Sequence, residues 1–314
     1  MDELRRACAA VARAASQVLV VEDAISGYAA GLPLAAGGSP GADAVAPPAG
    51  APPAVAPPAR DREWRAAFWL TMDAINFGSG WFPTLRKRDG RSGYNTIATA
   101  LAERFHRAGP WSATELAALP ALDVAEALGQ DAGHELMALY AASLRDLGTH
   151  VAAEHGGRFT AVADAAEGSA LSLVHHLGSW SCFADRSRYG SLELPFLKRA
   201  QIAAADLERA GVARFGDLGR LTMFADNLVP HVLRIDGVLS YAPSLVDRVE
   251  RGELIAHDSP EEIEIRACAV HAVELIVAAR GDTTPAAVDQ LLWNRGQQPV
   301  YKASPRHRTR CTAY

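Results

Sequence analysis

A lone carboxylate in a mainly apolar stretch is the first feature of this sequence that suggests chemistry. The stretch extends from Phe215 to Leu233, and in it Asp226 follows a turn bounded by glycines and stands four residues before Pro230. A carboxylate in such surroundings can stabilise the positive charge that a sugar develops as its glycosidic bond breaks, or it can activate water. The alternative is structural, because an aspartate very often caps the first turn of a helix.

Polar side chains also stand among aromatic residues in the segment from Phe68 to Phe82. Helical spacing assigns most of these aromatic residues to a core, but Asp73 and Asn76 are polar. Buried polar groups need hydrogen-bonding partners. A polar face beside rings such as Phe77 is suited to stacking on a nucleobase and to hydrogen bonding with the edge of that base.

The sequence predicts neither a metal site nor a bound cofactor. Its four cysteines are scattered without a CxxC pair, and the glycine-rich motifs of dinucleotide-binding, P-loop and α/β-hydrolase enzymes are absent. The dipeptide His257-Asp258 also occurs in metal-dependent phosphohydrolases, but no partner ligands are evident for it. His175 and His176 are expected on one helix, where adjacent side chains diverge by about 100°, so they cannot share an ion.

Helices must position these residues, because helical periodicity dominates the sequence after residue 60. Four helices carry start and stop signals: 136–151, ended by Gly156-Gly157; 196–210, ended by Gly211; 259–280, opened by the capping box Ser259-Pro260-Glu261-Glu262; and 284–296, opened by Thr284-Pro285. In the third of these helices we expect Arg266 to pair with Glu262, four residues before it. Ser16 to Val21 is the best strand candidate, and no series of alternating segments predicts a sheet. The predicted fold class is mainly α, with few or no strands.

Composition divides the chain into three parts. Residues 1–28 form an N-terminal segment that we expect to pack on the main domain, residues 29–60 a flexible insertion rich in Ala, Pro and Gly, and residues 61–314 a single multi-helix domain. From Ala29 to Ala59 the only charged residue is Asp43 and no residue is aromatic. Such a segment cannot bury enough surface to offset the entropy lost on ordering. At 314 residues the whole chain can bury a large core without disulfides.

Charge and hydropathy bear on partners and compartment. A formal net charge of −5 argues against a protein that grips nucleic-acid backbone, because such binding depends on Lys and Arg neutralising phosphates. Two basic clusters, at 86–91 and 302–310, are either solvated surface or a local basic pocket. The apolar part of the N-terminus is interrupted by Arg13, which is unlike a signal peptide, and no apolar run approaches the ~20 residues that span a bilayer. We expect a cytoplasmic protein with no nucleic-acid and no membrane partner.

Short stretches from residue 72 onward occur in an order that matches one known family. They are MDAINF (72–77), SGY (92–94), FAD (183–185) with Tyr189-Gly190, FLKRAQI (196–202), MFAD (223–226) with Pro230, EIEIRAC (262–268), LLW (291–293) and PRHRTRC (305–311), with a weaker match at 18–29. In this ordered set the chain resembles the queuosine salvage proteins, which are queuosine 5'-phosphate N-glycosylases with a fold related to helix-hairpin-helix DNA glycosylases. The resemblance implies that residues 61–314 form a helical glycosylase domain.

The resemblance also implies a reaction, hydrolysis of the N-glycosidic bond of queuosine 5'-phosphate with release of queuine for salvage into tRNA modification. Asp226 is then the expected catalytic carboxylate. Queuine is a 7-deazaguanine, with carbon in place of the N7 that acids protonate in purines, so the catalytic demand shifts to the sugar and to hydrogen-bond donors aimed at the departing base. Asn76, Asn227 and Asn294 are candidate donors. The family commonly has tyrosine at position 227 and aspartate at position 294, so a negative charge is missing from position 294 in this chain.

Further residues are assigned to the other groups of this substrate. Its amine requires a carboxylate, its ring requires aromatic faces, and its 5'-phosphate requires cations, among which arginine is the better bidentate partner. The candidates are Asp185 or Asp73 for the amine, Phe183 and Trp293 together with Phe77 for the ring, and Lys198, Arg199, His307 and Arg308 for the phosphate. Lys198 and Arg199 point to different helix faces, so at most one of them should face the site.

Two other classes of function remain open from the sequence. A glycosylase that acts on DNA or RNA requires a continuous basic groove, and its binding falls steeply with salt. A binding protein for a modified nucleoside would be stabilised by its ligand without releasing the base. The sequence does not predict the oligomeric state.

Overall fold

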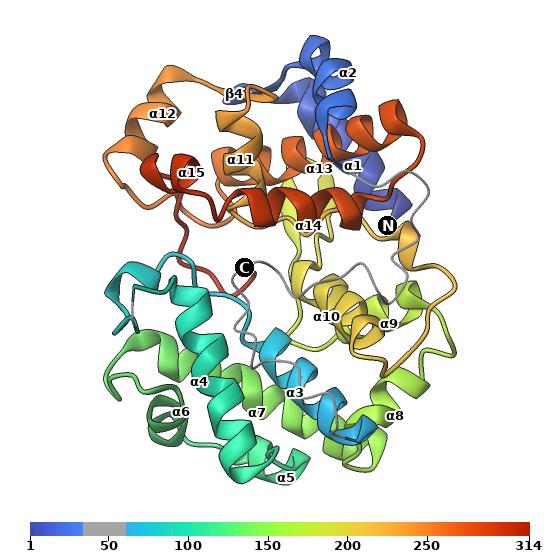
Figure 1. The fold of residues 1–314 in the computed structure, drawn as a ribbon, viewed down its shortest axis with the longest axis vertical. Coiled ribbons are helices and arrows are strands. Elements are labelled where there is room, and N and C mark those ends of the chain that lie inside the picture. The colour runs from blue at the N-terminus through green and yellow to red at the C-terminus, as the bar shows by residue number, and fades with distance from the viewer. Residues whose placement is uncertain (34–60, 89) are drawn as a thin grey trace.

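The computed structural model describes residues 1–33, 61–88 and 90–314, and within them the chain is mainly helical (Figure 1). This confirms the predicted fold class. The elements are α1 (Asp2–Ala14), β1 (Val18–Val20), α2 (Glu22–Gly31), α3 (Arg62–Ala74), η1 (Phe82–Thr84), α4 (Gly93–Ala108), α5 (Ala113–Ala117), α6 (Ala121–Leu128), α7 (Glu135–His155), α8 (Phe159–Asp164), α9 (Ala170–Leu177), β2 (Ser187–Tyr189), β3 (Leu192–Leu194), α10 (Lys198–Arg209), η2 (Leu218–Arg220), α11 (Val229–Ile235), β4 (Leu239–Tyr241), α12 (Pro243–Glu250), α13 (Pro260–Arg280), α14 (Pro285–Arg295) and α15 (Pro299–Ala303).

The strands form two small antiparallel sheets. β1 pairs with β4, with Val18 opposite Tyr241, and β2 pairs with β3 in a hairpin. The strand expected at 16–21 is therefore present in a shorter form. Its partner is far along the chain, and no sequence pattern indicated it.

Caps confirm the predicted end of α7 and the predicted starts of α13 and α14, whereas α10 begins at Lys198, two residues later than predicted. α7 ends at Gly156, which adopts the left-handed conformation that glycine tolerates best. The side chains of Ser259 and Thr284 accept backbone N–H groups in the first turns of α13 and α14. Only half of the capping box forms, because the Glu262 carboxylate accepts the backbone N–H of Asp258 instead of that of Ser259.

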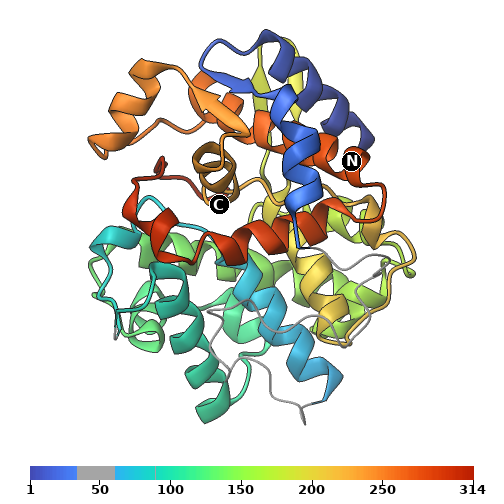
Figure 2. The same ribbon diagram turned by 45° about the horizontal axis from the view of Figure 1, so that its top comes forward.

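Most buried apolar residues of the described chain form two large hydrophobic cores, and Cys311, Ala313 and Tyr314 form a third, small cluster. The first core takes its residues from 64–221 and fills the part of the molecule that holds α3 to α10, the lower half of Figure 1. The second combines residues 4–32 with residues 194–301, because α1 and α2 pack on α13. The C-terminus lies between the two parts in Figure 1 and near the middle of the molecule in Figure 2. The C-terminal segment is therefore placed where it can line a cleft between the two cores.

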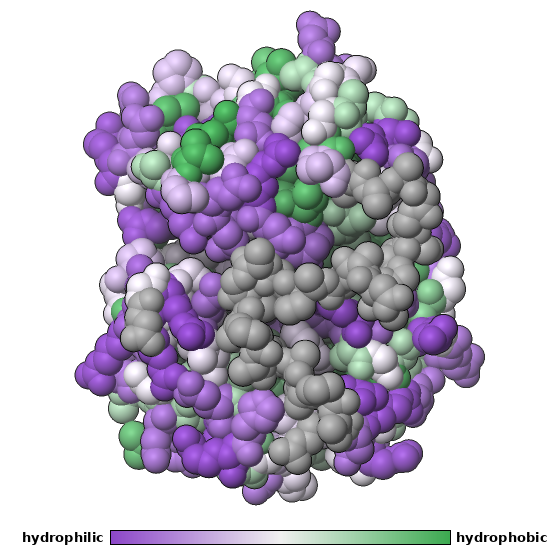
Figure 3. Space-filling model, in the orientation of Figure 1, coloured by the Kyte–Doolittle hydropathy of each residue, from purple (hydrophilic) through white to green (hydrophobic). Residues whose placement is uncertain are grey.

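The boundary of the expected insertion differs from the prediction. Ala29, Ala30 and Gly31 belong to α2, and the side chain of Ala29 is buried against α13. Residues 34–60, which hold the remainder of the insertion, lie outside the described residues. The face shown in Figure 3 is mostly hydrophilic, with small hydrophobic patches in its upper part. None of the helices in the described ranges is both long enough and apolar enough to cross a bilayer.

Candidate active site

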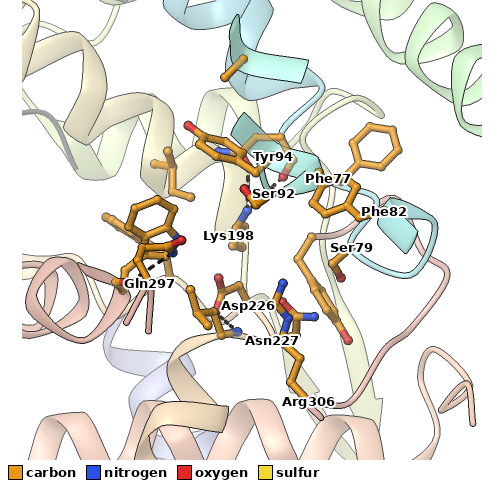
Figure 4. Close-up of a pocket in the computed structure, with 18 of the residues that line it drawn as sticks. Phe77, Ser79, Phe82, Ser92, Tyr94, Lys198, Asp226, Asn227, Gln297 and Arg306 are labelled. Carbon is orange, nitrogen blue, oxygen red and sulfur yellow. Dashed lines mark hydrogen bonds between the residues drawn. The ribbon is translucent and has the colours of Figure 1, made fainter. Parts of the chain in front are cut away.

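A pocket of about 1140 Å³ lies where the two cores meet. One wall comes from α3, the segment before α4, and α10, and the other from residues 224–228, α14, α15 and residues 304–308. Of the predicted site residues, seven line it: Asn76, Phe77, Lys198, Asp226, Asn227, Trp293 and Arg308. Figure 4 shows Lys198 and Asp226 facing the middle of this pocket from opposite walls.

Asp226 is held at the start of α11 by the backbone. Its Oδ1 accepts the N–H groups of Leu228 at 2.8 Å and Val229 at 3.0 Å. Asp226 therefore has the helix-capping role that was the structural alternative, because these N–H groups would otherwise have no partner within the helix. The same two bonds fix the orientation of a carboxylate whose side chain lines the cavity. A negative charge in a fixed position is what stabilisation of a cationic sugar requires.

Lys198 opens α10 on the opposite wall. The preceding residue, Leu197, adopts a left-handed conformation with φ of 47°, a conformation that a residue with a Cβ rarely adopts. The backbone N–H of Lys198 donates to Asp185, and its Nζ donates to the carbonyl oxygen of Asn76 at 2.9 Å. Burial lowers the pKa of Lys198 to about 8, and the attraction of Asp226 opposes this shift. The ammonium group therefore titrates close to neutral pH.

Rings and amides complete the central part of the pocket. Trp293 of α14 contacts Tyr94 of α4 edge to face, with ring centroids 5.9 Å apart, so the two walls touch through aromatic residues. Asn227 donates from Nδ2 to the carbonyl oxygen of His307, which ties the C-terminal segment to the pocket wall. Phe77 packs edge to face on Tyr140 behind the wall.

Two predicted carboxylates lie behind the pocket surface. Asp185 is buried in an ion pair with Arg266 at 2.6 Å, so it has a permanent cationic partner. Arg266 also lies 3.6 Å from Glu262, which agrees with the predicted spacing, although Asp185 is the shorter contact. Asp73 is fully buried, and burial raises its pKa to about 7 against the attraction of Arg209 and Lys198. Neither carboxylate lines the cavity, so neither is placed to meet a substrate amine.

Four further predicted residues also lie outside the pocket lining. Arg199 is buried between the rings of Phe77 and Phe183, at 4.8 and 5.9 Å, and donates to the carbonyl oxygen of Ala74. The expectation that only one of Lys198 and Arg199 faces the pocket is thus met by Lys198. Burial and the repulsion of Arg306 lower the pKa of His307 to about 3, so this ring is neutral and supplies no cation for a phosphate. The fourth, Asn294, accepts a hydrogen bond from Gln290.

Several lining residues were not predicted. Asp289 of α14 and Arg306 of the C-terminal segment both line the pocket near Asp226. Asp206 and Arg209 of α10 form an ion pair at its edge. The sequence held a signal for Asp289, because it is a carboxylate in the apolar stripe of the helix that contains Val288, Leu291, Leu292 and Trp293. Arg306 was part of a basic cluster, but nothing local distinguished it from its neighbours.

The C-terminal segment is fixed closely against the loop that follows α3. Gly78 donates its N–H to the carbonyl oxygen of Tyr314, the last residue. A Cβ atom at Gly80 would lie 2.4 Å from the carbonyl oxygen of Thr309, so only glycine allows this approach. Tyr314 and Arg308 both line the pocket. The segment therefore forms a wall of the site whose position depends on Gly80.

In the described ranges, two clusters of potential metal-ligating side chains occur away from the pocket. One contains Glu154, His155 and His176, in which the Nε2 atoms of the two histidines face each other at 2.9 Å. The other contains His257, Asp258 and Glu262. None of these residues lines the pocket. As expected, His176 does not converge with His175, because it faces a histidine from α7.

Comparison with known proteins shows the family of this chain. A family model described as "Queuosine salvage protein" matches residues 56–314. A protein of Sphaerobacter thermophilus named queuosine 5'-phosphate N-glycosylase/hydrolase is 37% identical over 266 residues, which cover 81% of this chain and 82% of that protein. A protein of Bos taurus with the same name is 32% identical over 190 residues, covering 54% of this chain and 56% of that protein. A third, of Schizosaccharomyces pombe, is 38% identical over 128 residues, 39% of this chain and 37% of that protein. The chain belongs to the queuosine salvage protein family.

Proposed function

We propose that this protein is an N-glycosidase that hydrolyses queuosine 5'-phosphate and releases queuine, the activity for which its relatives are named. One observation carries the proposal. Asp226, a carboxylate fixed by two backbone N–H groups, lines a cavity that also holds aromatic faces and cations. This is the set of groups that a nucleotide glycosidase needs: a charge for the sugar, surfaces for the base and cations for the phosphate.

Asp226 acts on the sugar side of the scissile bond. Cleavage of an N-glycoside leaves positive charge on C1' and the ring oxygen, and a carboxylate beside that charge lowers the barrier. Its Oδ1 is occupied by the N–H groups of Leu228 and Val229, which leaves Oδ2 for the substrate or for the attacking water. A 7-deazapurine cannot be activated by protonation at N7, so this stabilisation carries much of the catalysis.

The rest of the pocket recognises the base and the phosphate. Trp293, Tyr94 and Phe77 offer ring faces and edges for the deazaguanine system. Lys198, Arg306 and Arg308 are lining cations that can bind the phosphate. Asn76 and Asn227 supply amide groups for hydrogen bonds to the substrate.

The test is base release measured by chromatography. Purified protein is incubated with queuosine 5'-phosphate, the dephosphorylated nucleoside and GMP, each with and without EDTA. We expect queuine from queuosine 5'-phosphate at a rate that EDTA does not change. In Asp226→Asn the turnover number should fall at least about 10²-fold, because the amide keeps the acceptor for Leu228 and Val229 but lacks the charge. Absence of queuine release by the unaltered protein would refute the proposed function.

We propose three further properties of this protein. The free nucleotide, and not a nucleic acid, is the substrate, because the net charge is −5 and the lining cations are interspersed with carboxylates. A cytoplasmic location fits four free, buried cysteines. A relationship to helix-hairpin-helix glycosylases is favoured by Asp226, an aspartate that follows a helix and a glycine-bounded turn. Activity that does not depend on salt, together with a lack of DNA binding, would distinguish this enzyme from the members of that class that act on DNA.

A further inference from the structure

The described part of the pocket wall contains a second carboxylate whose purpose the sugar chemistry does not explain. Four acidic side chains line the cavity there: Asp206, Asp226, Glu250 and Asp289. Asp206 is ion-paired with Arg209, and Glu250 is exposed at the rim. Asp226 is held by backbone N–H groups. Asp289 is the remaining one, and it is 5% exposed.

Asp289 lies beside Asp226 without an ion-pairing partner of its own among the described residues. Its Oδ1 accepts the backbone N–H of Phe224 at 3.0 Å, which ties α14 to the segment that ends in Asp226. No hydrogen bond from the described residues reaches its Oδ2. The two charges that face it are Asp226, which repels its ionised form, and Lys198, which attracts it.

These surroundings favour the protonated form of the carboxyl group. Burial raises the pKa of Asp289 well above its ordinary value, and the negative charge of Asp226 raises it further. The N–H of Phe224 and the ammonium group of Lys198 oppose this shift. Two neighbouring carboxylates in different environments divide into an ionised group and a proton donor, a pattern shared by many acid–base enzymes.

The proposed substrate needs such a donor. When the bond between C1' and the base nitrogen breaks, the electron pair goes to the base, which must gain a proton to leave as a neutral molecule. A 7-deazaguanine has no N7 to accept that proton early, so a donor must reach another heteroatom of the base. Lys198 donates to Asn76, and the pocket-lining amides can hydrogen-bond to the base but cannot protonate it.

We propose that Asp289 is the catalytic acid that protonates the departing base, in an inference that rests on the proposed function. Asp289 gives its proton to the base as the glycosidic bond breaks, and the base leaves as queuine. Water then bonds to C1' and passes a proton to Asp226, which gives ribose 5-phosphate. Transfer of that proton from Asp226 to Asp289 restores both groups, so one water is consumed and nothing else is needed.

The experiment compares two leaving groups on the same sugar phosphate. The substrates are queuosine 5'-phosphate and 4-nitrophenyl ribofuranoside 5'-phosphate, whose nitrophenolate leaves without a proton. In Asp289→Asn the turnover number for queuosine 5'-phosphate should fall about 10² to 10⁴-fold. The turnover number for the nitrophenyl substrate should stay within about tenfold of that of the unaltered protein. Asp226→Asn is the matched comparison, and it should be slow with both substrates because it acts on the sugar.

A second measurement tests the role of Asp289 if the protein turns over the nitrophenyl substrate too slowly to measure. In Asp289→Gly, formate added at mildly acidic pH, where part of it is present as formic acid, should restore queuine release at least about tenfold, because formic acid can occupy the space of the missing carboxyl group and donate the proton. Asparagine retains the acceptor for Phe224, so thermal unfolding of Asp289→Asn should match that of the unaltered protein. Equal losses on both substrates, or no rescue by formate, would overturn the role of Asp289. Failure of the unaltered protein to release queuine would instead refute the proposed function.

Discussion

At the scale of single residues, burial and neighbouring charge decide which side chains of the pocket can do chemistry. Lys198 and Asp289 both lie near Asp226. Burial lowers the pKa of the lysine and raises the pKa of the aspartate, and each shift favours the neutral form of the side chain. Asp226 attracts the cation and repels the ionised acid, so it favours the charged form of Lys198 and the protonated form of Asp289. His307 is neutral for the same physical reason, because burial among arginines disfavours the imidazolium.

Lys198 should therefore limit the enzyme at alkaline pH. Its pKa is lowered to about 8, so the ammonium group is charged below that pH and neutral above it. We expect kcat/KM for base release to fall by about tenfold per pH unit above pH 8, since the loss of one proton removes the cation. In Lys198→Gln, which can still donate to Asn76, kcat/KM should be lower overall and this dependence should be absent. A decline of the same shape in the variant would assign the titration to another group.

At the scale of elements, caps fix where the helices start and close backbone contacts fix where the C-terminal segment lies. The side chains of Ser259 and Thr284 define the starts of α13 and α14, and α14 carries Asp289 and Trp293 to the pocket. The C-terminal segment has little regular structure, so its position depends on contacts with the loop after α3, above all at Gly80.

Gly80→Ala should weaken substrate binding although Gly80 itself does not line the pocket. The new Cβ would lie 2.4 Å from the carbonyl oxygen of Thr309, and backbone atoms cannot move aside as a flexible side chain can. We expect a loss of about 1–3 kcal/mol in the free energy of unfolding and a several-fold rise in KM as Arg308 and Tyr314 shift.

Gly27→Ala is the matched control for this change. Gly27 lies in α2 with nothing within 4 Å of an added Cβ, so the substitution should be neutral or slightly stabilising. Denaturant unfolding and steady-state kinetics of the two variants measure both effects. Unchanged KM and stability in Gly80→Ala would show that the contact does not hold the segment.

At the scale of the whole molecule, the site exists because two cores meet. α10 belongs to the first core and carries Lys198, whereas Asp226 follows residues of the second core. A ligand between them contacts both, so its binding should stabilise the complete fold and not one part alone.

Ligand stabilisation can be measured without turnover in Asp226→Asn. Queuosine 5'-phosphate at a hundred times its Kd should add about 2.7 kcal/mol to the free energy of unfolding, seen as a higher Tm in a single transition. GMP at the same concentration should add less, and duplex DNA at moderate salt should add nothing. Two separate transitions, of which the ligand shifts only one, would contradict a site shared by both cores.

The sequence by itself determined the helical class, the main caps and the family, because each depends on local periodicity, on residues within one turn, or on an ordered set of short motifs. It also led to the prediction that Asp226 is the catalytic carboxylate. Only the tertiary structure decided which side chains face the cavity. Asp289 meets the Phe224 backbone across 65 residues of sequence, and Asp185, which lies between α9 and β2, is neutralised by Arg266 of α13. Burial and long-range pairing arise when distant segments pack together, so no local pattern distinguishes the carboxylate at the cavity wall from the one behind it.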